Sequence, residues 1–355
     1  MGARDQRGDG RSQRERQAMI DGSETTAEKA AQGSKRAVLL LAHGTPETVE
    51  EVPEYLRNVV RGHELPQAVV EEIQRRYAQI GKSPLTEWTL RQAELLRQAL
   101  GVPVYVGMRN WKPTIAEAVR AMRDEGVTEA VAICLAPQNS RTSVGLYRRA
   151  AYAETGDTIR LHFIESWADH PRLMDAFAER LRPVWQQACH ASGARIPVLF
   201  TAHSVPCRTI QTAPVQIPPT RVPQEPDSSP DPYAVEAKRT AALVAERLSS
   251  EGLTERDWFF AFQSQGISGG PWIGPTVEET LQAIRNEGHA GVVLQPIGFL
   301  CDHVEILYDI DIAFQSLAKE IGLKLWRPES LNASPLLIAA LADLAAPYLS
   351  GRRAK

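Results

Sequence analysis

The sequence predicts an α/β protein made of two similar halves, each a parallel sheet flanked by helices. From residue 37 onward, short and nearly continuous apolar runs alternate with longer amphipathic ones, a pattern typical of parallel strands covered on both faces. Residues 113–137 and 275–299 share one pattern: Pro-Thr, a helix, an acidic residue with glycine, then a strand. A chain of 355 residues fits two domains of ordinary size.

Eight apolar runs rich in β-branched and aromatic residues predict the strands. They span residues 37–42, 103–108, 130–136, 159–166, 197–204, 258–264, 291–299 and 323–328. Amphipathic runs between them predict helices at residues 68–80, 85–100, 114–126 and 276–288, and a long helix of about 171–192 that joins the halves. The proline-rich run 213–233 excludes a helix or a central strand and predicts a surface loop.

The domain boundaries follow from these elements. Residues 1–35 are polar and charged, with almost nothing to bury, which predicts a disordered tail. Translation from Met19 instead of Met1 is a second hypothesis for this end. The N-terminal half is predicted to span 36–190 and the C-terminal half 191–345, with the last helix able to pack back on the first half. Residues 346–355 are predicted to form a tail.

Composition excludes several classes of function. The net charge of −3 offers no strong field for nucleic acid, and the longest apolar runs are too short to span a bilayer. The four cysteines form no C-x-x-C pair, so neither a zinc ribbon nor an iron–sulfur site is indicated. Scattered cysteines without a signal peptide favour a reducing compartment, and we expect a cytoplasmic protein. There is no G-x-G-x-x-G, P-loop or G-x-S-x-G motif.

Chemistry is expected where the strands end, since open parallel sheets bind ligands at their carboxyl edge. His203 ends one predicted strand, and the acidic run 302–311 follows another. Glu305 and Asp309 are four residues apart and would share one helix face, where they repel each other unless a positive charge is present. A proton path, a metal site and a solvated helix face all remain open for this run. A neutral imidazole opposite carboxylates binds divalent metals or accepts protons.

Several of these blocks resemble one family. "TAHSVP", "DPYAVE", "AFQSQ…PWIGP" and "PIGFLCDHVEILYDID" are similar to signature blocks of ferrochelatase. "LLAHGTPETVEEVPEYLRNV", "IGKSPLTEWT", "VGMRNWKPTIAEAV" and "LAPQNSRTSVGLY" match its N-terminal half. The resemblance runs in the family's order from about residue 37 to 345.

The resemblance implies two Rossmann-like, chelatase-like domains with a porphyrin cleft between them. It implies insertion of Fe²⁺ into protoporphyrin IX or coproporphyrin III with release of two protons, a lyase reaction in the terminal steps of haem biosynthesis. Iron is then a substrate, and no cofactor is required. No cysteine follows Cys301, so the C-terminal [2Fe–2S] cluster of some relatives is not expected. The catalytic histidine maps onto His203 and the essential glutamate onto Glu305, both also metal candidates.

The resemblance also supplies weaker site candidates. Asp309 and His43 are further metal candidates, and His43 has the alternative of a cleft histidine hydrogen-bonded to its loop. A third acid found one turn further in relatives is replaced by Ala313. The porphyrin-binding candidates are His43, Arg61, Arg76, Tyr77, Ser83 and Tyr147.

Two rival functions stay open at this point. One is a chelatase that inserts cobalt or iron into a sirohydrochlorin, and the other is a non-catalytic haem or metal carrier on the same fold. The expected partners are porphyrin and ferrous iron, with transient contact to neighbouring haem-pathway enzymes left open. No nucleic acid or transmembrane segment is expected, while an apolar product leaves peripheral membrane contact open.

Overall fold

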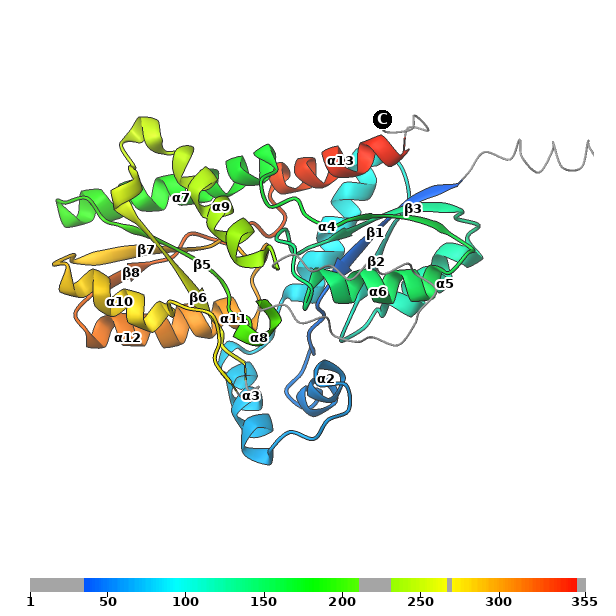
Figure 1. The fold of residues 1–355 in the computed structure, drawn as a ribbon, viewed down its shortest axis with the longest axis horizontal. Coiled ribbons are helices and arrows are strands. Elements are labelled where there is room, and N and C mark those ends of the chain that lie inside the picture. The colour runs from blue at the N-terminus through cyan, green and yellow to red at the C-terminus, as the bar shows by residue number, and fades with distance from the viewer. Residues whose placement is uncertain (1–34, 211–230, 267–269, 350–355) are drawn as a thin grey trace, which may run out of the picture. The chain divides into compact units, whose positions relative to one another are not determined.

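The computed structural model describes residues 35–210, 231–266 and 270–349. The described residues from Arg36 onward form one compact unit, in which the strands make two parallel four-stranded sheets (Figure 1). The first sheet has the order β2-β1-β3-β4 and the second the order β6-β5-β7-β8. Most of the predicted tail 1–35 and of the predicted loop 213–233, and residues 350–355 of the predicted tail 346–355, lie outside the described residues. The predicted limits at 233 and 346 are wrong, because a helix begins at Tyr233 and the last helix continues to Leu349.

All eight predicted strands are confirmed, with ends that shift by three residues or fewer. The first sheet consists of β1 (Arg36–Ala42), β2 (Val104–Met108), β3 (Glu129–Cys134) and β4 (Arg160–Ile164). The second consists of β5 (Val198–His203), β6 (Trp258–Gln263), β7 (Gly291–Pro296) and β8 (Lys324–Trp326). Central strand β1 is buried from Ala37 to Ala42, because helices cover both of its faces and leave only apolar side chains suitable there.

The helices of the first half are α2 (Val52–Val59), α3 (Gln67–Ile80), α4 (Leu85–Leu100), α5 (Ile115–Asp124) and α6 (Val144–Thr155). The long helix α7 (Pro171–Ser192) leads to the second half, as predicted. There follow α8 (Cys207–Ile210), α9 (Tyr233–Glu246), two single turns at Ser249–Glu251 and Glu255–Asp257, and α10 (Val277–Asn286). The last helix, α13 (Pro335–Leu349), contacts α4, α7 and β3 and continues past residue 345.

The repeated sequence pattern has a structural cause. Thr114 and Thr276 each cap a helix, α5 and α10, and each forms a reciprocal capping box with the glutamate three residues later. Each of these helices follows an edge strand, β2 or β6, and leads to the strand on the other side of the central one. The two halves therefore repeat the same β-α-β arrangement.

The acidic run folds differently from the single helix that its spacing suggests. Residues Val304–Leu307 form the short helix α11, Asp309–Phe314 form a π-helix, and α12 (Gln315–Glu320) follows. Asp302 precedes the helix, since His303 is its N-cap residue. Asp302 therefore does not stack with Glu305 on a helix face.

Candidate active site

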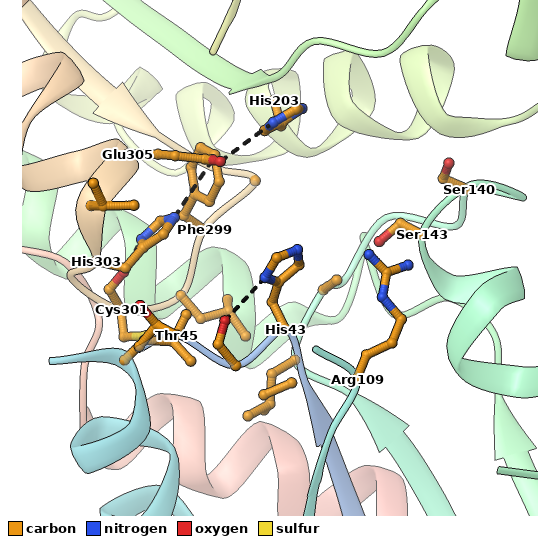
Figure 2. A pocket seen from close by; sticks show the side chains of 18 of the residues that line it. His43, Thr45, Arg109, Ser140, Ser143, His203, Phe299, Cys301, His303 and Glu305 are labelled. Carbon is orange, nitrogen blue, oxygen red and sulfur yellow. Dashed lines mark hydrogen bonds and ion pairs between the residues drawn. The ribbon is translucent and has the colours of Figure 1, made fainter. Parts of the chain in front are cut away.

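A cavity of about 360 Å³ lies at the carboxyl ends of strands from both sheets. Its lining comes from the turns after β1, β3, β5 and β7, from Arg109 after β2 and Trp272 after β6, and from side chains of α2, α3, α4, α6 and α9. Figure 2 shows His43, Arg109, His203, His303 and Glu305 around this space. The sequence prediction that strand-to-helix turns of both halves face one site is confirmed by this lining.

Glu305 lies between two histidines in the cavity wall. One of its carboxylate oxygens, Oε1, is 3.5 Å from Nε2 of His203, and Oε2 is 3.6 Å from Nε2 of His303 (Figure 2). In each histidine the other ring nitrogen, Nδ1, forms a hydrogen bond with a backbone carbonyl oxygen. The partner of His203 is Ser204, and the partner of His303 is Cys301, at 3.0 Å. Each backbone contact orients its ring so that Nε2 faces the carboxylate.

The electrostatics of this group favour opposite charges on His203 and Glu305. Burial lowers the pKa of His203, but attraction to Glu305 outweighs it, and the pKa is raised above its usual value. Burial raises the pKa of Glu305, but His203 and then His303 outweigh it and hold that pKa well below its usual range. At neutral pH the pair therefore consists of a carboxylate facing an imidazole that readily holds a proton.

The loop that carries His303 and Glu305 is held by polar groups from one neighbouring segment, residues 327–332. Nδ2 of Asn332 donates to Asp302 Oδ2 at 3.0 Å, and Ser330 donates to Oδ1 at 2.7 Å. Arg327 lies 3.4 Å from Asp302 and bonds both carboxylate oxygens of Asp311. These bonds fix the chain immediately before and after Glu305.

Asp309, one of the weaker metal candidates, begins the π-helix behind Glu305 and lies outside the cavity lining. Ser264 donates to its Oδ2 at 2.5 Å, and Nη1 of Arg76 lies 3.5 Å from its Oδ1. Burial and then repulsion from Glu305 raise the pKa of Asp309 to about 6. Repulsion between the two acids, expected from their spacing, is therefore present.

His43 lines the cavity, and both of its ring nitrogens are already engaged. Nδ1 lies 3.1 Å from the carbonyl oxygen of Gly44 and from Oη of Tyr55, and Asn110 Nδ2 donates to Nε2 at 3.0 Å. Burial and then Arg109 lower the pKa of His43 to about 4. A neutral ring bonded to its loop matches the alternative that the sequence left open for this residue.

The porphyrin candidates separate into two groups. Tyr77 and Tyr147 line the cavity, and Tyr77 shares a 2.8 Å hydrogen bond with Thr45. Arg76, Ser83 and Arg61 do not line it. Arg76 faces Asp309 and also bonds Glu72 at 2.9 Å.

Ser83 and Arg61 lie in different surroundings from the cavity candidates. Ser83 is buried, and its hydroxyl has no partner in the part of the chain that the structure describes. Arg61 lines a neighbouring cavity of about 470 Å³. Both were expected at the porphyrin, and this geometry does not bring them into the main cavity.

Sequence reasoning missed two groups in the site. His303 was not among the predicted site residues, yet its Nε2 faces the carboxylate directly. Arg109 was not singled out, although its place just after β2 puts it at the sheet edge where ligands bind. Within the described ranges, no three His, Cys, Asp or Glu side chains are grouped to hold a metal ion.

Comparison with known proteins identifies the family. The ferrochelatase family model matches residues 35–348. The chain is 60% identical to a ferrochelatase of Acidobacterium capsulatum over 88% of its length and 94% of the relative. It is 39% identical to a ferrochelatase of Deinococcus radiodurans, covering 86% of this chain and 94% of that one.

A more distant relative and a solved structure complete the comparison. The coproporphyrin III ferrochelatase of a Geobacillus species is 32% identical over 87% of this chain and 96% of its own. Among solved structures, SirB from Bacillus subtilis with Fe³⁺ has a TM-score of 0.54 at 12% identity, covering 89% of this chain and 96% of that one. This last likeness shows the two-sheet chelatase fold alone. The chain belongs to the ferrochelatase family.

Proposed function

We propose that this chain inserts Fe²⁺ into a porphyrin bound in the main cavity and releases the two pyrrole protons. The observation that carries the proposal is the pair of His203 and Glu305, 3.5 Å apart at the junction of both sheets. A chelatase must remove protons from the macrocycle and accept a cation in their place. A paired imidazole and carboxylate in one cavity wall supply both requirements.

The proton path that we propose begins at His203. Its Nε2 takes a pyrrole proton while Nδ1 stays bonded to the Ser204 carbonyl oxygen, so the ring does not have to turn. Glu305, which faces Nε2, keeps its negative charge and stabilises the imidazolium that forms. Asp309, with a pKa of about 6, can exchange that proton near neutral pH.

Iron enters this scheme as a substrate. Glu305 supplies negative charge to the incoming cation, and His203 and His303 supply imidazole nitrogens on either side of it. Each ferrous ion then replaces two protons, so the macrocycle keeps its charge. Asp309 remains the weaker candidate for metal contact, whereas His43, whose two ring nitrogens are both engaged, keeps its alternative role as a cleft histidine bonded to its surroundings.

We also propose roles for the porphyrin candidates, a boundary between the halves and a location for the protein. Tyr77 and Tyr147 contact the porphyrin, and Arg76, Ser83 and Arg61 approach it once it is bound. The two halves divide near residue 190. We propose a cytoplasmic protein that needs no cofactor, and none of the described helices is long and apolar enough to cross a membrane.

An anaerobic assay tests the function against its rivals. Fe²⁺ is mixed with protoporphyrin IX, coproporphyrin III or sirohydrochlorin, and the absorbance of each macrocycle is followed. We expect many turnovers with a porphyrin and none with sirohydrochlorin. Binding of haem with no turnover would indicate a carrier, and turnover of sirohydrochlorin alone would indicate the other chelatase.

A further inference from the structure

The main chain of His203 is held by a hydroxyl group from a neighbouring helix. Tyr233, the first residue of α9, donates from Oη to the carbonyl oxygen of His203 at 2.8 Å. Tyr233 is 7% exposed and lines the main cavity. Burial and then Glu305 raise the pKa of Tyr233 above the ordinary tyrosine value, so the hydroxyl stays a donor at neutral pH. This hydrogen bond therefore fixes the end of β5 at the proposed proton acceptor.

The segment that follows His203 is fixed within the second half. The backbone N–H of Ser204 donates to the carbonyl oxygen of Gln263 at 2.7 Å, and the hydroxyl of Ser204 donates to that of Ile273 at 2.8 Å. Nδ1 of His203 is bonded to the carbonyl oxygen of Ser204. The ring is therefore anchored, through Ser204, to β6 and the turn after it, whereas the carbonyl group of His203 is anchored to α9.

One face of α9 is bonded to two loops of the first half. Oε2 of Glu236 accepts the backbone N–H of Asn139 at 2.6 Å and the hydroxyl of Ser166 at 2.8 Å. One turn further along the helix, the hydroxyl of Thr240 accepts from Nε2 of Gln138 at 3.2 Å. These bonds join α9, an element of the second half, to the turns that follow β3 and β4.

Tyr233 begins the same helix face, since positions 233, 236 and 240 are spaced three and four apart. Just before the helix, the carboxylate of Asp231 accepts the backbone N–H groups of Tyr233 and Arg141, each at 3.0 Å. Asp231 is 4% exposed, and hydrogen bonds to an ionised carboxylate are stronger than those between neutral groups. The first half therefore sets the position of the start of α9, and with it the position of the Tyr233 hydroxyl.

We propose that Tyr233 is a positioning residue, through which the first half of the chain holds His203 beside Glu305. This role rests on the proposed function, in which His203 takes a pyrrole proton 3.5 Å from Glu305. The Tyr233 hydroxyl acts on the carbonyl group of His203 and exchanges no proton with the macrocycle. Because displacement of a reacting group by about 1 Å can cost about 100-fold in rate, one hydrogen bond at this carbonyl is enough to affect catalysis.

The first test removes the hydroxyl alone. Tyr233→Phe keeps the ring that lines the cavity, so we expect kcat for anaerobic iron insertion to fall about 10-fold while the porphyrin KM stays unchanged. Tyr152→Phe is the matched control. Oη of Tyr152 also donates to a backbone carbonyl oxygen, that of Leu161 at 3.4 Å, but Tyr152 lies outside the cavity lining. The control should leave kcat and KM unchanged.

The second test concerns the connection to the first half. Glu236→Ala removes the acceptor for Asn139 and Ser166 at a residue outside the cavity lining. We expect a smaller loss of kcat, about 3-fold, because α9 keeps its other bonds to the first half. If Glu236 acts through Tyr233, the double variant should lose no more kcat than Tyr233→Phe alone, since coupled losses are not additive.

NMR spectra of the His203 ring separate this role from the proposed function. The ring resonances should shift in Glu236→Ala, whose altered side chain has no printed contact with His203 in the described residues, and should stay in place in Tyr152→Phe. With an active chain, the positioning role is overturned by an unchanged kcat in Tyr233→Phe, by a loss that falls on KM alone, by additive losses in the double variant, or by ring resonances that do not shift in Glu236→Ala. If the unaltered chain metallates no porphyrin, the proposed function fails, and the ring resonances alone decide whether Tyr233 and α9 position His203.

Discussion

Replacing Glu305 with glutamine removes the negative charge between two histidines while keeping the size of the side chain. Glu305 lies 3.5 Å from His203 and 3.6 Å from His303. In the Glu305→Gln variant, the attraction to Glu305 that raises the pKa of His203 is gone. Burial, the largest cause, is then opposed only by the Ser204 carbonyl and Asp309, and we expect the pKa of His203 to fall. The imidazolium that forms when His203 takes a proton then has no carboxylate beside it to stabilise it.

The magnitude follows from the distance and the exposure of the pair. Two unit charges 3.5 Å apart attract by about 5 kcal/mol at an effective dielectric constant of 20 and by about 1 kcal/mol in water. The side chains are 35% and 32% exposed, so we expect about 2 kcal/mol after solvent screening. Loss of the charge that stabilises the imidazolium should lower kcat by about 100-fold or more, the range for general acid–base groups.

Two measurements check this prediction. NMR titration of the His203 ring should show its pKa above the ordinary histidine value in the unaltered chain and a lower pKa in Glu305→Gln. Anaerobic kinetics should show the loss in kcat, with porphyrin KM changed little. Glu287→Gln, which removes an acid 3.8 Å from the surface histidine His289, is a matched control. If the pKa of His203 is the same in both variants, the reasoning about the pair is wrong.

The other predictions concern the surroundings of the pair. Asp309→Asn should make the free energy of unfolding depend less on pH. Because the pKa of Asp309 is raised to about 6, its favourable contribution to the free energy of unfolding is complete below about pH 4 and is lost by about pH 6. Urea unfolding at several pH values should show a loss of about 2–3 kcal/mol for the unaltered chain over that interval which the variant lacks; parallel curves would contradict it. Asn332→Ala removes a hydrogen bond to Asp302 and should lower kcat about 10-fold at constant KM. Asn332→Asp should recover only part of this loss in kcat. An unchanged kcat would exclude the positioning role of Asn332. His43→Ala should leave ferrous-iron binding spectra unchanged, since both ring nitrogens are engaged; altered spectra would make His43 a ligand.

The fold could be predicted because both sheets are buried on two faces. Central strands such as β1 read as unbroken apolar runs, and the capped helices α5 and α10 carry their start signals in Thr114 and Thr276. These signals are local, so a single sequence contains them. The position of His203 at the end of one strand and of Glu305 after another followed from the same pattern.

The remaining features depend on contacts between distant segments. Residues Asp309–Phe314 form a π-helix where an α-helix was expected, and the spacing of these residues does not predict it. Asp302 begins the acidic run 302–311, yet its partners lie about thirty residues later, at Ser330 and Asn332. In the sequence Arg109 is a lone arginine in a turn. It is identified as a site residue only by the structure, where its buried Nε and Nη1 have no hydrogen-bond acceptor among the described residues.

We propose that each chain repeatedly exchanges two pyrrole protons for one ferrous ion at the pair of His203 and Glu305. The most direct measurement is anaerobic stopped-flow mixing of Fe²⁺ with excess porphyrin in a weakly buffered indicator dye, recording porphyrin absorbance and proton release together. The account predicts many porphyrins metallated per chain and two protons released for each. A single equivalent of bound porphyrin with no further proton release would contradict it.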